Sequence, residues 1–179
     1  MSTITLDENL ILLMAEGDRA AFSEFYRQTS SAVYGFALSI LRNKHDAEDV
    51  MHDAFIRAYS AAVSYKPSGT PMAWLLTIVR NLCYNRIRAG KVCEDIVEYG
   101  NLAAASPEDS IDRMVLEQAM EILDSEERQV VVLHALTGLK HREIADILEV
   151  PVGTVLSKYN RALKKMRKEL EGKGYGNDR

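Results

Sequence analysis

Apolar residues recur at intervals of three and four along most of this 179-residue chain, the spacing that places them on one face of a helix. Strand signals are scarce, because the sequence has no Asn-Gly or Asp-Gly hairpin dipeptide and no sustained alternation of apolar and polar residues. The chain is therefore predicted to be all-α, with helices at about residues 6–16, 18–42, 43–62, 70–89, 107–123, 125–136, 141–148 and 151–171.

Local signals set the starts of several of these helices. Thr5 and Glu8 have the spacing of a capping box. Asn43 can cap the third helix, and Thr70-Pro71 combines an N-cap residue with the proline that suits the first helical position. Residues 90–106 lack helical periodicity and are rich in small and acidic side chains, a composition typical of a flexible linker. We therefore predict two small helical domains, residues 1–92 and 107–179, joined by a linker at residues 93–106.

The net charge of −4 conceals two basic blocks with an acidic block between them. Residues 70–93 carry four basic and no acidic side chains, and residues 137–179 carry ten basic and six acidic ones. Residues 94–136 carry eleven acidic and two basic side chains. Two separate contacts with a polyanion would require such a distribution, although solvated faces of surface helices are also charged. The motifs have to decide between these interpretations.

Composition argues against several classes of protein. No run of 18 apolar residues is present, so no membrane insertion is predicted. The N-terminus has neither the basic region nor the apolar core of a signal peptide, which predicts a cytoplasmic location. The cysteines, Cys83 and Cys93, form no CxxC pair and stand near none of the four histidines, so no metal site is predicted. We predict no catalytic site and no cofactor either.

The sharpest local signal is the run from His141 to Val155, which has the pattern of a helix, a tight turn and a second helix. In the first helix, Ile144, Ala145 and Leu148 are predicted to face the core. The second helix is divided into an apolar stripe (Val152, Val155, Tyr159, Ala162, Leu163, Met166 and Leu170) and a polar, basic face that includes Thr154, Ser157, Lys158, Asn160, Arg161, Lys164 and Lys165.

A helix divided in this way suits the major groove of duplex DNA, where Lys and Arg neutralise phosphates and Ser, Asn or Arg reach base edges. A basic amphipathic helix can also lie on a membrane or bind a partner. The preceding helix and turn favour a DNA-binding helix-turn-helix.

A second candidate nucleic-acid surface covers residues 65–91, where no acidic residue occurs. It combines basic, amide and aromatic side chains: Tyr65, Lys66, Trp74, Arg80, Asn81, Tyr84, Asn85, Arg86 and Arg88. Unpaired bases stack on aromatic rings, and their phosphates attract cations. The aromatic residues among them can equally be core residues, Trp74 above all. This surface is predicted to hold separated DNA strands.

Four acids, Asp46, Glu48, Asp49 and Asp53, lie on the predicted third helix beside its apolar face. Paired carboxylates can bind metal or act in catalysis. No histidine or glycine-rich loop accompanies them in a recognisable spacing, so a surface that docks a basic protein partner is favoured.

In their order and spacing, four stretches of this chain resemble the extracytoplasmic-function sigma factors of bacterial RNA polymerase. They are Gly17-Asp18 with Ala21-Phe22, residues 46–59, residues 73–81, and residues 143–162 with Val152-Gly153-Thr154-Val155 at their centre. The resemblance covers about residues 6–171. It implies a region-2 helical bundle and a region-4 helix-turn-helix, in an alternative sigma factor that brings core polymerase to promoters and helps to open the DNA.

The resemblance also implies a role for each surface. Asp46, Glu48, Asp49, Asp53, Phe55 and Arg57 would bind the clamp helices of the polymerase largest subunit. Asn81 and the loop at residues 65–69 would capture a flipped base of the minus-ten element. The helix-turn-helix would read the minus-thirty-five element with help from the polymerase flap, and an anti-sigma factor is an implied partner. Leu156-Ser157-Lys158 replaces the Arg-Ser-Arg common in the family, and leucine cannot hydrogen-bond guanine.

Two alternatives stay open from the residues alone. The chain could be a helix-turn-helix regulator that binds DNA without polymerase, which would leave residues 46–59 and the Trp74 helix unexplained. It could also be an enzyme with a carboxylate metal site at Asp46, Glu48, Asp49 and Asp53.

Overall fold

The computed structural model describes residues 6–67, 69–90 and 120–172, and within these ranges the chain forms helices and no β-strand. The elements are α1 (Glu8–Ala15), α2 (Arg19–Leu41), α3 (Lys44–Ala61), a short 3-10 helix η1 (Ala62–Ser64), α4 (Pro71–Arg88), α6 (Ser125–Thr137), α7 (His141–Leu148) and α8 (Val152–Gly172). The all-α prediction is confirmed. The predicted linker at residues 93–106 and nearly all of the predicted helix at 107–123 lie outside the described residues.

Short-range capping explains where most of these helices begin. Gly17 has a φ of +89°, a left-handed conformation that glycine adopts without steric cost, and it ends the first helix. Asp18 then caps α2 by accepting hydrogen bonds from the backbone N–H groups of Ala20 and Ala21. Asn43 caps α3 by accepting from the Asp46 N–H at 2.9 Å, as predicted. Pro71 is the first residue of α4, also as predicted.

The predicted capping box at Thr5 and Glu8 is wrong. Helix α1 begins at Glu8, and its N-cap is Asp7, whose carboxylate accepts from the Asn9 N–H at 2.9 Å. Glu8 is therefore in the first position of the helix, where its side chain cannot reach back to the N-cap N–H. It reaches instead to the loop before α4, with Tyr65 and Gly69 as donors.

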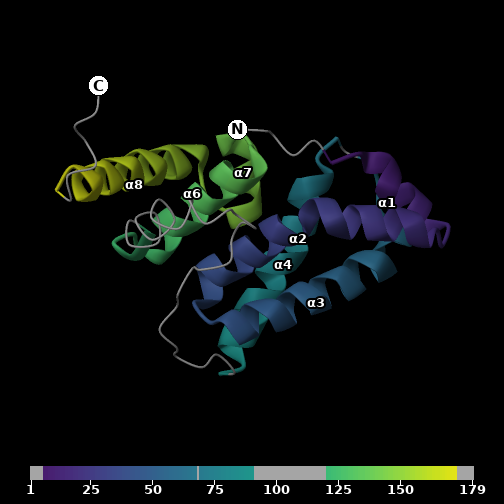
Figure 1. The fold of residues 1–179 in the computed structure, drawn as a ribbon. Coiled ribbons are helices and arrows are strands. Elements are labelled where there is room, and N and C mark those ends of the chain that lie inside the picture. The colour runs from purple at the N-terminus through teal and green to yellow at the C-terminus, as the bar shows by residue number, and fades with distance from the viewer. Residues whose placement is uncertain (1–5, 68, 91–119, 173–179) are drawn as a thin grey trace, which may run out of the picture.

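Helices α1 to α4 form a bundle in which α2 contacts each of the other three (Figure 1). The inward face of α2 carries fully buried aromatic and aliphatic residues, among them Phe25, Val33 and Phe36. The ring of Phe55, from α3, lies edge-on to Phe25 with ring centroids 6.0 Å apart. Burial of this apolar face, more than helix propensity, stabilises the bundle.

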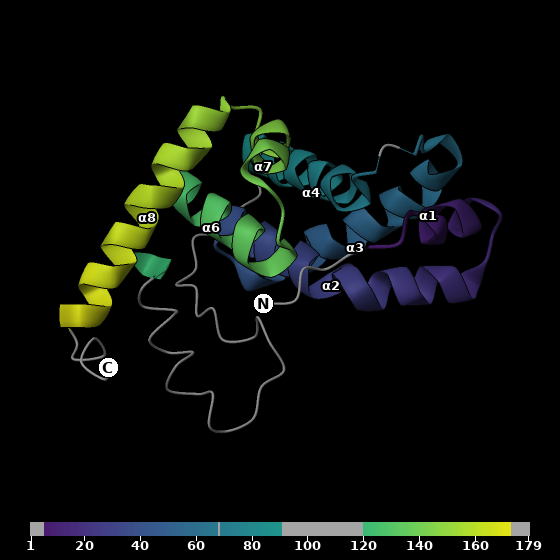
Figure 2. The same ribbon diagram turned by 90° about the horizontal axis from the view of Figure 1, so that it is seen from above.

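Helices α6, α7 and α8 form a second group, with α6 lying between α8 and α2 (Figure 2). Two histidines and a tyrosine support its interior: the rings of His134 and His141 are stacked with centroids 5.1 Å apart, and Tyr159 is edge-on to both. Nδ1 of His134 lies 3.0 Å from the carbonyl oxygen of Leu139, which accepts a hydrogen bond from that nitrogen. These contacts hold α8 against α6 and α7.

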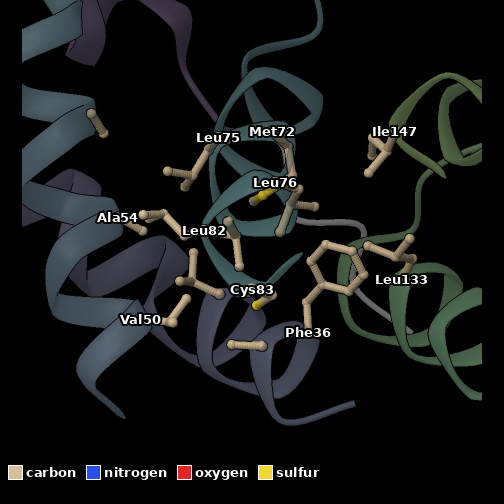
Figure 3. Close-up of a cluster of buried hydrophobic side chains, with 14 of the residues drawn as sticks. Phe36, Val50, Ala54, Met72, Leu75, Leu76, Leu82, Cys83, Leu133 and Ile147 are labelled. Carbon is tan, nitrogen blue, oxygen red and sulfur yellow. The ribbon is translucent and has the colours of Figure 1, made fainter. Parts of the chain in front are cut away.

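The two groups pack directly against each other, which the sequence did not predict. Helix α6 contacts α2, and α7 contacts α4. Leu133 and Ile147 from the second group share one buried cluster with Phe36 and Leu76 from the first, and Figure 3 shows them facing one another. The description of two helical domains is correct, but within the described residues they form a joint core.

Candidate nucleic-acid and polymerase interfaces

Helix α3 exposes only part of the predicted docking surface. Glu48, Asp49, Asp53 and Arg57 are exposed. Asp46 is 5% exposed. Phe55 is 3% exposed, because its ring contacts Phe22, Phe25 and Tyr26. Asp46 and Phe55 thus belong to the interior of the bundle, and the other four residues are accessible to a partner.

Asp46 has an internal partner that sequence reasoning missed. Its Oδ1 accepts a hydrogen bond from Nε of Arg86 at 2.6 Å, and a second nitrogen of Arg86 donates to Asp49 at 2.8 Å. Burial lowers the pKa of Arg86, but the hydrogen bonds and charges of Asp49 and Asp46 outweigh burial and raise it. The three residues tie α3 to α4, so Arg86 is occupied within the protein rather than facing solvent.

Apolar residues on the outer side of α3 were also missed. Ile56 is 65% exposed and Tyr59 is 39% exposed. Ile56 lines two adjacent hollows. One, of about 510 Å³, also borders Phe22, and the other, of about 460 Å³, lies between α3 and α4 and borders Asn81. The sequence did hold a signal for this surface: Ile56 is a large aliphatic residue on the polar side of an amphipathic helix, outside the pattern of core positions.

Helix α4 divides the predicted minus-ten residues between two faces. Asn81, Asn85 and Arg88 are exposed and spaced by three and four, so they share one face. Arg80 and Tyr84 are half-buried on another face, where the guanidinium of Arg80 lies 5.1 Å from the centre of the Tyr84 ring. That second face is turned toward α7, because Arg80 forms an ion pair with Glu149 at 3.1 Å.

Aromatic packing beneath the surface holds the start of the loop before α4. Tyr65 is 9% exposed, and its ring contacts that of the half-buried Trp74 with centroids 4.9 Å apart. Lys66 is exposed. The structure therefore places Tyr65 and Trp74 as supports of the loop and leaves Lys66 accessible to a ligand.

Helices α7 and α8 have the helix-turn-helix arrangement that the sequence predicts. The turn between them contains Glu149 in a left-handed conformation, with φ +56°, and Pro151 directly before α8. Ile144, Ala145 and Val155 are buried as predicted. Ile147 is buried too, while Leu148 is only half-buried. The predicted apolar stripe of α8 is narrower than expected, because Val152 and Leu163 are 39% and 43% exposed.

The polar face of α8 keeps a continuous exposed row at the spacing of a helix turn: Ser157, Asn160, Arg161 and Lys164. Thr154 is half-buried at the start of the helix. The side chain of Lys158 is only 15% exposed and pairs with Glu126 of α6. Lys165 donates to Glu127 of α6 at 2.6 Å. The row of exposed residues is thus free to face DNA, whereas Lys158 and Lys165 also hold α8 to α6.

The described part of the chain offers no metal site. No three His, Cys, Asp or Glu side chains converge there to hold an ion, and this includes the four acids of α3. Within the same residues, no helix is both long and apolar enough to cross a lipid bilayer.

Comparison with known proteins identifies the two helical groups. Residues 25–92 match the Sigma-70 region 2 family, and residues 113–166 match Sigma-70 region 4. The ECF RNA polymerase sigma factor SigW of Bacillus subtilis is 32% identical over 171 residues, which span 87% of this chain and 91% of SigW. The ECF sigma factor SigE of Mycolicibacterium smegmatis is 34% identical over 168 residues, 87% of this chain and 65% of SigE.

Solved structures give the same fold. CnrH, in complex with the cytosolic domain of CnrY, has a TM-score of 0.68 at 24% identity and covers 93% of this chain. The sigma factor RpoE of Bartonella quintana, in complex with the anti-sigma factor NepR, has the same TM-score and identity and covers 84% of it. With the sequence relatives, both domain families and the helix-turn-helix in agreement, this chain belongs to the extracytoplasmic-function family of RNA polymerase sigma factors.

Proposed function

We propose that this chain is an alternative sigma factor that docks on core RNA polymerase through α3 and directs it to promoters. The exposed acids Glu48, Asp49 and Asp53 are the charged part of the docking surface, and Ile56 is its apolar centre. An exposed aliphatic residue inside a polar rim is the arrangement that interface hot spots have. The exposure of Ile56 is the single observation that carries this assignment, because the fold itself has no use for it.

The exposed face of α4 is proposed to hold the opened minus-ten strand. Asn81 borders the 460 Å³ hollow beside Ile56, and its amide can donate to and accept from the edge of an unpaired base. Asn85 and Arg88 are exposed on the same face, where they can bind a phosphate of the strand next to that base. The row from Ser157 to Lys164 on α8 is proposed to contact the minus-thirty-five duplex, with the polymerase flap beside it.

An anti-sigma factor is the proposed regulatory partner. The related structures are those of CnrH in complex with the cytosolic domain of CnrY and of RpoE in complex with the anti-sigma factor NepR. We propose that a protein of this kind occupies the surfaces above when the sigma factor is idle. A cytoplasmic site of action and the absence of catalysis in this chain complete the proposal, since the polymerase performs the chemistry.

A pair of variants tests the assignment of surfaces. Asp53→Ala with Ile56→Ser is expected to weaken binding to immobilised core polymerase and to leave binding of the isolated chain to a minus-thirty-five duplex unchanged. Lys164→Ala is the matched control: it is expected to weaken binding to the duplex and to leave binding to core polymerase unchanged. Loss of both activities in both variants would contradict the separation of the surfaces.

Asn81→Ala tests the capture of a base. It is expected to slow promoter opening, measured by 2-aminopurine fluorescence within the minus-ten element, while core binding stays at the wild-type level. Asn85→Ala removes an amide one turn further along the same face. A slower opening by Asn81→Ala than by Asn85→Ala would place the base at Asn81. Opening at the wild-type rate by Asn81→Ala would contradict the proposal.

A further inference from the structure

Glu8 lies on the first turn of α1, outside every surface described above, yet its carboxylate contacts the loop that leads into α4. Its Oε1 accepts hydrogen bonds from the hydroxyl of Tyr65 and from the backbone N–H of Gly69, the second at 3.1 Å. Tyr65 opens the loop at residues 65–70, and Gly69 is near its end. One carboxylate oxygen therefore holds both ends of this loop together.

The first residues of the loop are held by ring packing or are exposed. The ring of Tyr65 packs on Trp74, while Lys66 and Pro67 are exposed. Gly69 has a φ of +75°, a left-handed conformation that residues other than glycine rarely adopt. Hydrogen bonds to an ionised carboxylate are stronger than neutral ones, so Glu8 is a strong polar anchor for Tyr65 and Gly69.

We propose that Glu8 is a positioning residue for the minus-ten strand: it ties Tyr65 to Gly69 in the loop before α4 without touching DNA. This inference rests on the proposed function of that loop. It predicts that removal of the carboxylate changes which bases the loop accepts, an effect that a loss of helix stability alone would not produce.

The test uses the full chain with core polymerase and promoters randomised in the minus-ten element. Glu8→Ala is expected to slow opening by about tenfold, as the loss of a hydrogen bond to a charged group implies, and to flatten the base preference. Glu8→Gln keeps an acceptor oxygen and is expected to recover part of both. Glu16→Ala removes an exposed carboxylate at the other end of α1 and is the control.

An unchanged base preference in Glu8→Ala, with only a lower melting temperature, would overturn the role of Glu8. Asn81→Ala in the same assay separates this from the proposed function. Normal opening by Asn81→Ala contradicts the proposed function, whereas slow opening by Asn81→Ala with normal opening by Glu8→Ala contradicts the role of Glu8 alone.

A different observation, the packing of α7 on α4, carries a second inference. The guanidinium of Arg80 lies 3.1 Å from Oε1 of Glu149 and 3.4 Å from the carbonyl oxygen of Leu148, so its side chain is only 16% exposed. Tyr84 lines a small cavity of about 40 Å³ together with Leu148 and Lys158. Two residues of the predicted strand-binding surface are thus covered by the chain's own second domain.

This contact has a built-in cost. The Nε of Arg80 is buried and has no hydrogen-bond partner within the described residues. A buried donor without a partner costs free energy that solvent exposure would return. Against this cost stands the apolar seam of Leu133 and Ile147 with Phe36 and Leu76 (Figure 3). The unpaired Nε of Arg80 therefore destabilises the closed arrangement, and the apolar seam stabilises it.

We infer that the closed arrangement is an autoinhibited form, in which α7 occupies the Arg80 and Tyr84 face of α4 in place of promoter DNA. The inference rests on the proposed sigma-factor function and on the role in binding the minus-ten strand that the sequence predicts for Arg80 and Tyr84. Engagement of polymerase and promoter has to separate α7 from α4, because DNA and Glu149 compete for the same guanidinium.

Small-angle scattering of the free chain tests the closed form without DNA or polymerase, so its result does not depend on the proposed function. Glu149→Lys places a cation against Arg80 and is expected to raise the radius of gyration. Asp146→Lys makes the same charge change at an exposed position of α7 and is the control. Glu149→Lys combined with Arg80→Glu restores the ion pair and is expected to restore the compact profile.

Affinity for a single-stranded minus-ten oligonucleotide completes the test. Glu149→Lys is expected to bind it more tightly than Asp146→Lys does, by the factor by which the open fraction rises. A wild-type profile of separated domains would overturn the closed form, and equal radii for Glu149→Lys and wild type would overturn the role of the Arg80–Glu149 ion pair in holding it. A larger radius with no gain in affinity over Asp146→Lys would overturn its inhibitory role.

Discussion

Asp124 shows how one residue links a helix start to the rest of its domain. Its carboxylate accepts from the Glu127 N–H at 2.8 Å, and Glu127 accepts in turn from the Asp124 N–H at 3.1 Å, a reciprocal capping box at the start of α6. Glu127 is 1% exposed and also accepts from Lys165 of α8. Loss of the cap therefore loosens the contact between α6 and α8.

Asp124→Ala is expected to lower the free energy of unfolding by about 1 kcal/mol, the usual cost of removing an N-cap. Asp124→Asn keeps a capping oxygen and is expected to cost less. Urea unfolding measures both. Equal stabilities of Asp124→Ala and wild type would contradict the role of the cap.

The same residue predicts a dependence on pH. Burial raises the pKa of Asp124, but the Glu127 N–H and the charges of Lys158 and Lys165 outweigh it, and the pKa falls below its ordinary value of 3.8. The ionised form thus stabilises the folded state. This contribution is complete above the unfolded-state pKa and is lost as the pH falls through the folded-state value. Asp124→Asn is expected to lose less stability than wild type between pH 5 and pH 3, because its side chain does not titrate; an identical loss would contradict this.

Cys83 is a buried thiol without a reactive role. Burial raises its pKa to about 12, so almost none of it is thiolate at pH 8. In a Cys93→Ser variant, alkylation by N-ethylmaleimide at pH 8 is expected to be slow in native buffer and fast in denaturant. Rapid alkylation of the folded protein would contradict the burial of Cys83.

At the scale of the element, the pair of α3 and α4 depends on Arg86. Arg86→Ala removes a charged partner of the buried Asp46 and is expected to cost about 3 kcal/mol of unfolding free energy. Asp49 is 62% exposed, so Asp49→Ala is expected to cost less than about 1 kcal/mol. Thermal or urea unfolding compares the two. Similar small losses would show that the buried pair does not hold the helices together.

Helix α8 predicts the salt dependence of duplex binding. Lys164 is exposed in the row that is proposed to face the minus-thirty-five element. Its replacement by alanine is expected to reduce the slope of log affinity against log salt concentration by about one, the effect of one lost phosphate contact. Fluorescence anisotropy with a labelled duplex measures the slope. An unchanged slope would place Lys164 away from the phosphates.

Helix starts such as those at Asn43 and Pro71 could be predicted from sequence because a cap acts over three or four residues. The hydrogen bond between Arg86 and Asp46 could not be predicted in this way, because the two residues are 40 positions apart in the chain. The same holds for Lys158, which pairs with Glu126 of α6. Charge patterning identifies a basic face, but only the packing of helices decides which of its cations stay free for a ligand.

For the molecule as a whole, the sequence predicted two domains and their families, and it missed that they share a core. An apolar stripe specifies that a helix is buried, and Phe36 on α2 fits a partner from either domain equally well. The contact of α7 with α4 depends on surfaces brought together from distant parts of the chain. Such a joint core makes a closed and an open form of one protein physically reasonable.

As a sigma factor, this chain gives core RNA polymerase its choice of promoter. The most direct test is run-off transcription by purified core polymerase on a pooled promoter library, with and without the chain. We predict discrete transcripts, from promoters that share a minus-ten and a minus-thirty-five element, only when the chain is present. The same transcripts without the chain, or no binding of the chain to core polymerase and no promoter-dependent transcript, would contradict the account.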